Sequence, residues 1–156
     1  MGCGAWIKIS RSERIHVCWN GGRGTNNLAQ LMALWCGLLA VCNLKLHHVS
    51  IYGDSKLIIH VFLGLSPHSS ITSHGWFKRA KYLWGKLESP PLYHIYRENN
   101  TRADSLSKMG LGMGHGLLQV SQYIDNNKVW SSDVPIPWFS IIWNQFECHI
   151  WGGFVF

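Results

Sequence analysis

Carboxylates are few in this sequence, so any chemistry that needs them must use a small number of positions. The chain of 156 residues holds eight Asp and Glu residues against fourteen Lys and Arg residues. Asp54 directly follows an apolar run that ends in Tyr52-Gly53, and Asp104 lies shortly after Asn99-Asn100-Thr101. Both positions stand where one predicted element gives way to the next. They are the first candidates for a site.

Each candidate also has a structural explanation. Asp54 could cap the helix that follows it, and Asp104 could be a first-turn acid favoured by the helix dipole. Gln30, three residues after Asn27, is explained as the partner of an Asn27 cap in a reciprocal capping pair. For each residue considered alone, this structural explanation is simpler than a role in a functional site.

The charge balance indicates the class of partner. The formal net charge is +6 and the isoelectric point is near 9.2, which favours nucleic acid, with an acidic membrane surface as the alternative. Apolar residues make up 47% of the chain and charged residues 14%, which excludes a solvated disordered chain. One face of a predicted helix is basic and carries Lys78, Arg79 and Lys81. This face is either simply exposed to solvent or binds the phosphates of a nucleic acid.

Cysteine and histidine spacing argues against a metal or disulfide framework. The five cysteines are odd in number and form no CxxC pair, and the nine histidines form no HxxxH pair. Reduced thiols in an intracellular protein are the expectation, and no basic segment with a hydrophobic core suggests a secretory signal. We therefore expect a protein of the nucleus or cytoplasm that is not secreted.

Two apolar stretches deserve comparison with membrane spans. Residues 28–44 form the shorter one, and a buried core helix explains it better. Residues 134–156 are rich in Trp and Phe but contain two prolines and a charge, which leaves an interfacial role open.

The elements that would position the candidate residues alternate between strand and helix patterns. Strands are predicted at 4–10, 15–19, 46–52 and 92–96, and helices at 28–41, 55–65, 73–88 and 99–109. This order predicts a mixed α/β domain over residues 1–110. Residues 111–156 show no clear element and are expected to form a C-terminal tail.

Three segments in order resemble one family. Thr25-Asn26-Asn27-Leu28-Ala29-Gln30 resembles its TNNxAE helix start, Tyr52-Gly53-Asp54-Ser55 its strand-ending DS, and residues 97–106 (RENNTRADSL) its RxxNxxAD-L signature. Together they resemble the type-1 ribonuclease H domain, in the form found in plant proteins related to retrotransposon reverse transcriptases. The match spans residues 2–110 and implies a ribonuclease H-like mixed sheet flanked by helices.

The resemblance implies hydrolysis of the RNA strand of an RNA–DNA hybrid by two divalent ions, usually Mg²⁺, held by four acids. Asp54 and Asp104 match two of those acids and would be the metal ligands, while Gln30 stands at the place of the family's helix Glu. The resemblance also implies that Thr25, Asn26 and Asn27 contact the hybrid. With two acids of four, impaired catalysis and weak Mg²⁺ binding are expected.

The family's first acid belongs to a strand that would precede Gly2. We therefore expect an N-terminally truncated domain, from a shortened gene model or a decayed element copy. Without that strand, its two neighbours in the sheet, predicted at 4–10 and 46–52, should become edges. Two other functions stay open: a non-catalytic nucleic-acid-binding module, and a membrane-associated protein that uses its aromatic C-terminal stretch.

Overall fold

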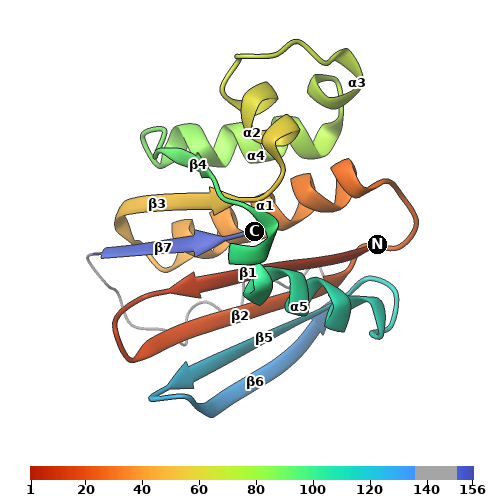
Figure 1. The fold of residues 1–156 in the computed structure, drawn as a ribbon. Coiled ribbons are helices and arrows are strands. Elements are labelled where there is room, and N and C mark those ends of the chain that lie inside the picture. The colour runs from red at the N-terminus through yellow and green to blue at the C-terminus, as the bar shows by residue number, and fades with distance from the viewer. Residues whose placement is uncertain (136–150) are drawn as a thin grey trace.

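The structure is a computed structural model that describes residues 1–135 and 151–156. In it the chain forms a seven-stranded mixed sheet with helices on both faces (Figure 1). The predicted mixed α/β class and the order of elements up to residue 111 are confirmed, with the short α3 and a 3-10 turn as additions. The strands are β1 (Gly2–Lys8), β2 (Glu13–Asn20), β3 (His47–Gly53), β4 (Leu92–His94), β5 (Leu117–Ile124), β6 (Asn127–Pro135) and β7 (Trp151–Val155). The helices are α1 (Asn26–Asn43), α2 (Lys56–Phe62), α3 (Ser69–Thr72), α4 (Gly75–Lys86) and α5 (Thr101–Leu111), and the 3-10 turn is η1 (Arg97–Asn99).

Helix α1 is the centre of the core. Its side chains are apolar nearly all round, because it packs on the sheet with one side and on α4 with another. The cap of α1 differs from the prediction: Thr25 is the N-cap, and its Oγ1 accepts a hydrogen bond from the Leu28 amide at 3.2 Å. The predicted capping pair of Asn27 and Gln30 is wrong, which frees the Gln30 side chain for other contacts.

The last described strand of the chain, β7, lies inside the sheet between β3 and β1. The strand order is β4-β3-β7-β1-β2-β5-β6, with β7 antiparallel to β1 and parallel to β3. In the register, Trp6 lies opposite Val155 and Tyr52 also lies opposite Val155, on the other side of β7. The expectation that β1 and β3 become edges is wrong, because β7 hydrogen-bonds to both and joins the two parts of the sheet.

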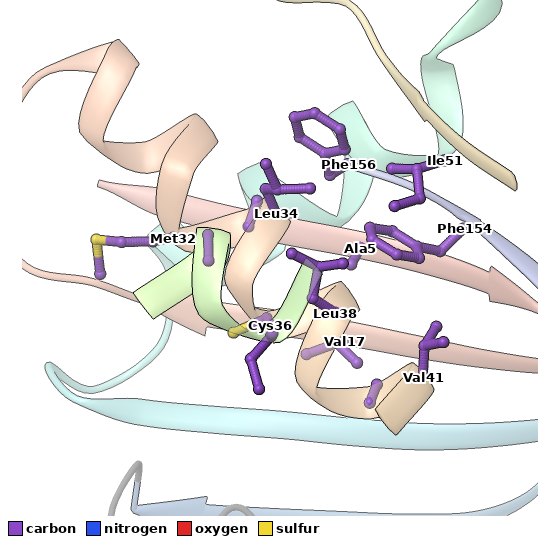
Figure 2. Packing of buried hydrophobic residues seen from close by; sticks show 14 of the residues in the cluster. Ala5, Val17, Met32, Leu34, Cys36, Leu38, Val41, Ile51, Phe154 and Phe156 are labelled. Atoms are coloured by element: carbon purple, nitrogen blue, oxygen red, sulfur yellow. The ribbon is translucent and has the colours of Figure 1, made fainter. Parts of the chain in front are cut away.

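Two glycines make room for the aromatic side chains around β7. A Cβ on Gly37 of α1 would lie 2.2 Å from Cε2 of Phe154, and a Cβ on Gly53 would lie 2.5 Å from Cζ of Phe156. Both phenylalanines are buried, and Figure 2 shows their rings in the core with Leu34 and Leu38 of α1. The close fit of the two phenylalanine rings against these glycines therefore holds β7 between β3 and β1.

Residues 111–156, expected to form a tail, contribute three strands to the same sheet. β5 and β6 form a hairpin that pairs with β2, and β7 follows later in the chain. The aromatic stretch 134–156, considered for an interfacial role, lies largely at 136–150, outside the described residues. Among the residues that the structure describes, no helix combines the length and apolar character needed to cross a bilayer.

Candidate functional site

Asp54 lies in the turn between β3 and α2, with its carboxylate almost fully enclosed. The cap of α2 is Ser55, whose Oγ accepts from the Ile58 amide at 3.4 Å, so Asp54 is not used as a cap. The Asp54 side chain is 7% exposed. It receives a hydrogen bond from Gln30 Nε2 at 3.4 Å, and Arg97 Nε lies 3.7 Å from its other oxygen.

Gln30 faces this turn from α1. While its Nε2 donates to Asp54, its Oε1 is buried and has no hydrogen-bond partner within the described residues. A buried polar oxygen without a partner costs free energy, so it normally marks a place for a water, an ion or a ligand.

Asp104 reaches the same place from the first turn of α5. Helix α5 can lie this close to β1 because β1 carries glycines: a Cβ on Gly2 would lie 1.8 Å from the Ser107 carbonyl oxygen, and one on Gly4 would lie 2.6 Å from that of Ala103. The Asp104 carboxylate is paired with Lys108, whose Nζ lies 2.7 Å away one turn later on the helix.

Asn100 is a further member of the site that the sequence did not single out. Its Nδ2 donates to the Phe156 carbonyl oxygen at 3.0 Å, and its Oδ1 is buried with no partner among the described residues. Asn100 is 2% exposed, which is unusual for a polar residue. The available signal was its place in the RENNTRADSL segment, where an asparagine pair precedes the helix.

These four side chains line one pocket of about 160 Å³, together with Arg97, Asn26 and the β1 glycines. The structure therefore brings the predicted site residues Gln30, Asp54 and Asp104 together. Within residues 1–135 and 151–156, no three His, Cys, Asp or Glu side chains gather closely enough to hold a metal ion by themselves.

The donor set nevertheless suits a hard cation. Two carboxylates and two amides whose oxygens lack partners are oxygen ligands of the kind that Mg²⁺ and Ca²⁺ accept. Cys3 also lines the pocket, but burial raises the pKa of its thiol to about 12, so it stays a neutral thiol there. A soft-metal thiolate site is therefore not what this pocket offers.

The residues expected to contact nucleic acid do not form one cluster. Thr25 caps α1, Asn26 lines the pocket, and Asn27 lies on the first turn of α1. On α4, Lys78 and Arg79 are exposed, and the Arg79 guanidinium lies 4.7 Å from the centre of the Trp76 ring.

Lys81 differs from its two neighbours in the basic group. Its Nζ donates to the Phe62 carbonyl oxygen at 2.6 Å and lies 4.5 Å from the centre of the Trp84 ring. It therefore joins α4 to α2, whereas Lys78 and Arg79 remain available on the surface.

Comparisons with known proteins agree with this architecture. The family model described as "Reverse transcriptase-like" matches residues 2–110. RNase H1 from the halophilic archaeon Halobacterium salinarum NRC-1 is a similar solved structure, with 22% identity, a TM-score of 0.55 and coverage of 69% of this chain and 94% of that one. The N-terminal RNase H domain of Rv2228c from Mycobacterium tuberculosis, solved as a fusion with maltose-binding protein, has 22% identity, a TM-score of 0.52 and coverage of 70% and 91%.

Among the curated proteins, none matches this sequence significantly. The family match covers well over half of the chain, and the structural matches show the same fold at low identity. The segment that carries the pocket residues Gln30, Asp54, Asn100 and Asp104 lies within the matched range. This chain belongs to the reverse transcriptase-like family and has a ribonuclease H-like fold.

Proposed function

We propose that this protein is a ribonuclease H-type domain of retroelement origin that binds RNA–DNA hybrids and cleaves their RNA strand slowly at most. The observation that carries the proposal is the convergence of Gln30, Asp54, Asn100 and Asp104 from four parts of the fold on one small pocket. Membership of the reverse transcriptase-like family and the ribonuclease H-like fold support it. The plant retrotransposon-related origin and an intracellular place of action, in the nucleus or cytoplasm, belong to the same proposal.

Asp54 and Asp104 would be the charged ligands of a divalent cation, with the free oxygens of Gln30 and Asn100 as neutral donors. When bound, such ions, usually Mg²⁺ in the family that the motifs resemble, activate water and stabilise the leaving oxygen of a phosphodiester. The chain's own residues would hold these oxygens in place around the pocket.

Impairment follows from the charges around the two carboxylates. Arg97 lies beside Asp54 and Lys108 beside Asp104, so each anion already has a cationic partner from the chain. A divalent cation must compete with these partners, and the neutral Gln30 adds no negative charge to help it. We therefore expect weak Mg²⁺ binding and slow hydrolysis.

Hybrid binding would use two separate places, the start of α1 beside the pocket and the exposed cations of α4. Asn26 lines the pocket, Thr25 and Asn27 flank it on α1, and Lys78 and Arg79 expose positive charge on α4. Lys81 was included in this group from the sequence, and its contacts with Phe62 and Trp84 suggest that it supports α4 rather than touching phosphate.

The test is a cleavage assay with purified protein, an RNA–DNA hybrid and Mg²⁺. We expect slow RNA cleavage that Asp54→Asn abolishes and Gln30→Glu accelerates, because the added carboxylate strengthens cation binding. Asp125→Asn removes an equal charge from the exposed β5–β6 turn and should change nothing. A rate that is indifferent to Asp54→Asn, or a fast wild-type rate that Gln30→Glu does not raise, would contradict the proposal.

A second candidate function is a binding module without catalysis, favoured by the pairing of both carboxylates with built-in cations. It predicts hybrid binding that weakens with salt, with no Mg²⁺-dependent product. Charge reversal at Lys78 and Arg79 should then reduce binding, whereas Gln30→Glu should create no cleavage.

A further inference from the structure

A second basic surface lies on the face of the sheet that α5 partly covers. In the strand register, Lys8 pairs with Arg14, Arg14 with Tyr123, and Tyr123 with Lys128. Residues paired across neighbouring strands share one face of the sheet, so these four form a row across β1, β2, β5 and β6. With strands about 4.8 Å apart, the row is roughly 14 Å long.

A groove lies beside this row, between α5 and the strands β1 and β2, with a volume of about 380 Å³. We call it the α5 groove; it is lined by Trp6, Arg14, His16, Arg102 and four further residues, Thr101, Ser105, Leu106 and Met109. Figure 1 shows α5 across β1 and β2, with β5 and β6 continuing the sheet beside them. The groove adjoins the basic row, because Arg14 belongs to both.

Two guanidinium groups are held against the same aromatic ring in this groove. The Arg102 guanidinium carbon lies 4.3 Å from the centre of the Trp6 ring, and that of Arg14 lies 5.9 Å from it. Arg14 also donates to the Asn126 side-chain oxygen. Neither arginine is paired with a carboxylate in the described residues, so both keep donors for an anion in nearly fixed positions.

Aromatic rings accompany the cations. Tyr123 stacks on His16 with ring centres 4.3 Å apart, and Lys128 Nζ lies 5.9 Å from the centre of the Tyr123 ring. Burial, and to a lesser extent the positive charges of Arg14, Lys128 and Arg102, lowers the pKa of the His16 imidazole to about 4. The imidazole is therefore neutral at physiological pH and serves as a flat ring.

We propose that the α5 groove and the adjacent basic row bind single-stranded nucleic acid, with phosphates on Arg14, Arg102 and Lys128 and a base against Tyr123. Charge complementarity favours a polyanion, and rings between the cations favour one that carries bases, because base–aromatic stacking and phosphate contacts are how single strands are held. A row of about 14 Å suits the roughly two or three bases that sheet platforms stack.

This surface is separate from the acidic pocket. Within α5, Asp104 lines the pocket, whereas Arg102 and Ser105 line the groove. The proposal therefore does not depend on hybrid cleavage, and binding to it can be measured when no cleavage occurs.

The experiment measures fluorescence anisotropy of a labelled oligouridine of about ten nucleotides with the full chain. Arg14→Gln with Arg102→Gln should weaken binding at least tenfold and lower the slope of log affinity against log salt by about 1.4, at about 0.7 per lost phosphate contact. Tyr123→Ser should weaken binding about tenfold without changing that slope, because it removes stacking alone.

The matched control is Lys45→Gln with Lys86→Gln, which removes the same charge from two exposed positions, in the α1–β3 loop and at the end of α4, and should leave oligouridine binding within about twofold. Equal losses in both double variants would overturn the proposal, since they would show general charge attraction only. So would displacement of the oligonucleotide by inorganic phosphate at matched phosphate concentration, or stronger binding to phosphatidylserine vesicles, which would indicate a small-anion or lipid site.

A measurement on the wild-type chain guards against variants that do not fold. The His16 ring protons are titrated by NMR with and without oligouridine, and phosphates beside Arg14 and Arg102 should raise the pKa of His16. An unchanged His16 titration at saturating oligouridine would overturn the proposal.

Discussion

The position of β7 between β3 and β1 gives the sharpest stability prediction. Phe154 is 1% exposed, and its ring lies in the core against α1. Replacement of a buried phenylalanine by alanine costs about 3–5 kcal/mol. Against a total unfolding free energy of about 5–15 kcal/mol, Phe154→Ala should remove about a fifth of the stability or more.

In a chain of this size, a loss of about 4 kcal/mol corresponds to a fall in Tm of roughly 8–16 °C. The assay is urea unfolding followed by circular dichroism, with a thermal scan as a second measure. Leu65→Ala is the control, because Leu65 is 69% exposed, and it should change the unfolding free energy by less than about 0.5 kcal/mol. A Phe154→Ala loss as small as that of the control would refute the placement of β7.

Gly37→Ala tests the same contact from α1. In a helix this exchange usually stabilises by about 1 kcal/mol, but here the new Cβ would meet Phe154 Cε2 at 2.2 Å and Cδ2 at 2.4 Å. We expect a net loss of about 1–2 kcal/mol from overpacking.

Phe154→Leu removes the ring edge that meets this Cβ, so Gly37→Ala should cost less in its presence. A double-mutant cycle should therefore give a coupling of about 1 kcal/mol or more, and additivity within about 0.5 kcal/mol would refute the contact.

Three further predictions concern titration and packing. The pKa of His16 is about 4 in the folded protein and 6.5 in the unfolded chain, so the unfolding free energy should fall as the pH drops from 6.5 toward 4. His16→Gln should make this fall smaller, as measured by urea unfolding at several pH values. Burial raises the pKa of the Cys3 thiol from 9.0 to about 12 and that of the Cys18 thiol to about 11, so the unfolding free energy should fall as the pH rises above 9. Labelling of the native protein with iodoacetamide, mapped by mass spectrometry, should be slow at both thiols until urea unfolds the chain. Trp84→Phe deletes the hydrogen bond from Trp84 Nε1 to the Pro90 carbonyl oxygen at 2.8 Å, and calorimetry should show a loss of about 1 kcal/mol.

Local patterns in the sequence were enough to predict the main strands and helices of the first 111 residues, but not the short α3 and η1. The helix predicted at 73–88 is confirmed as α4, in which Ala80 and Leu83 are buried while Lys78 and Arg79 are exposed. The long apolar run located α1, because an all-round apolar helix must be buried on several sides. The strands predicted at 4–10 and 15–19 are confirmed as β1 and β2, which pair antiparallel across the short segment that joins them.

What the sequence did not predict depends on contacts between distant residues. The occupant of the slot between β1 and β3 is set by how Phe154 and Phe156 fit against Gly37 and Gly53, and no local pattern encodes such a pairing. Gln30 was explained as a capping residue because its true partner, Asp54, lies 24 positions away. The role of Asn100 likewise became visible only when its buried oxygen was found in the pocket.

The position of β7 between β3 and β1 also affects how the protein folds while it is being synthesised. β1 and β2 leave the ribosome early, yet the strand that joins them to β3, which includes Phe154, is made after the other described strands. At a synthesis rate of about 5–20 residues per second, the early strands wait on the order of ten seconds with an unpaired edge. During that interval the nascent chain exposes a template for pairing with other chains, so we expect its yield in cells to depend on chaperones that cover this edge until β7 has been made.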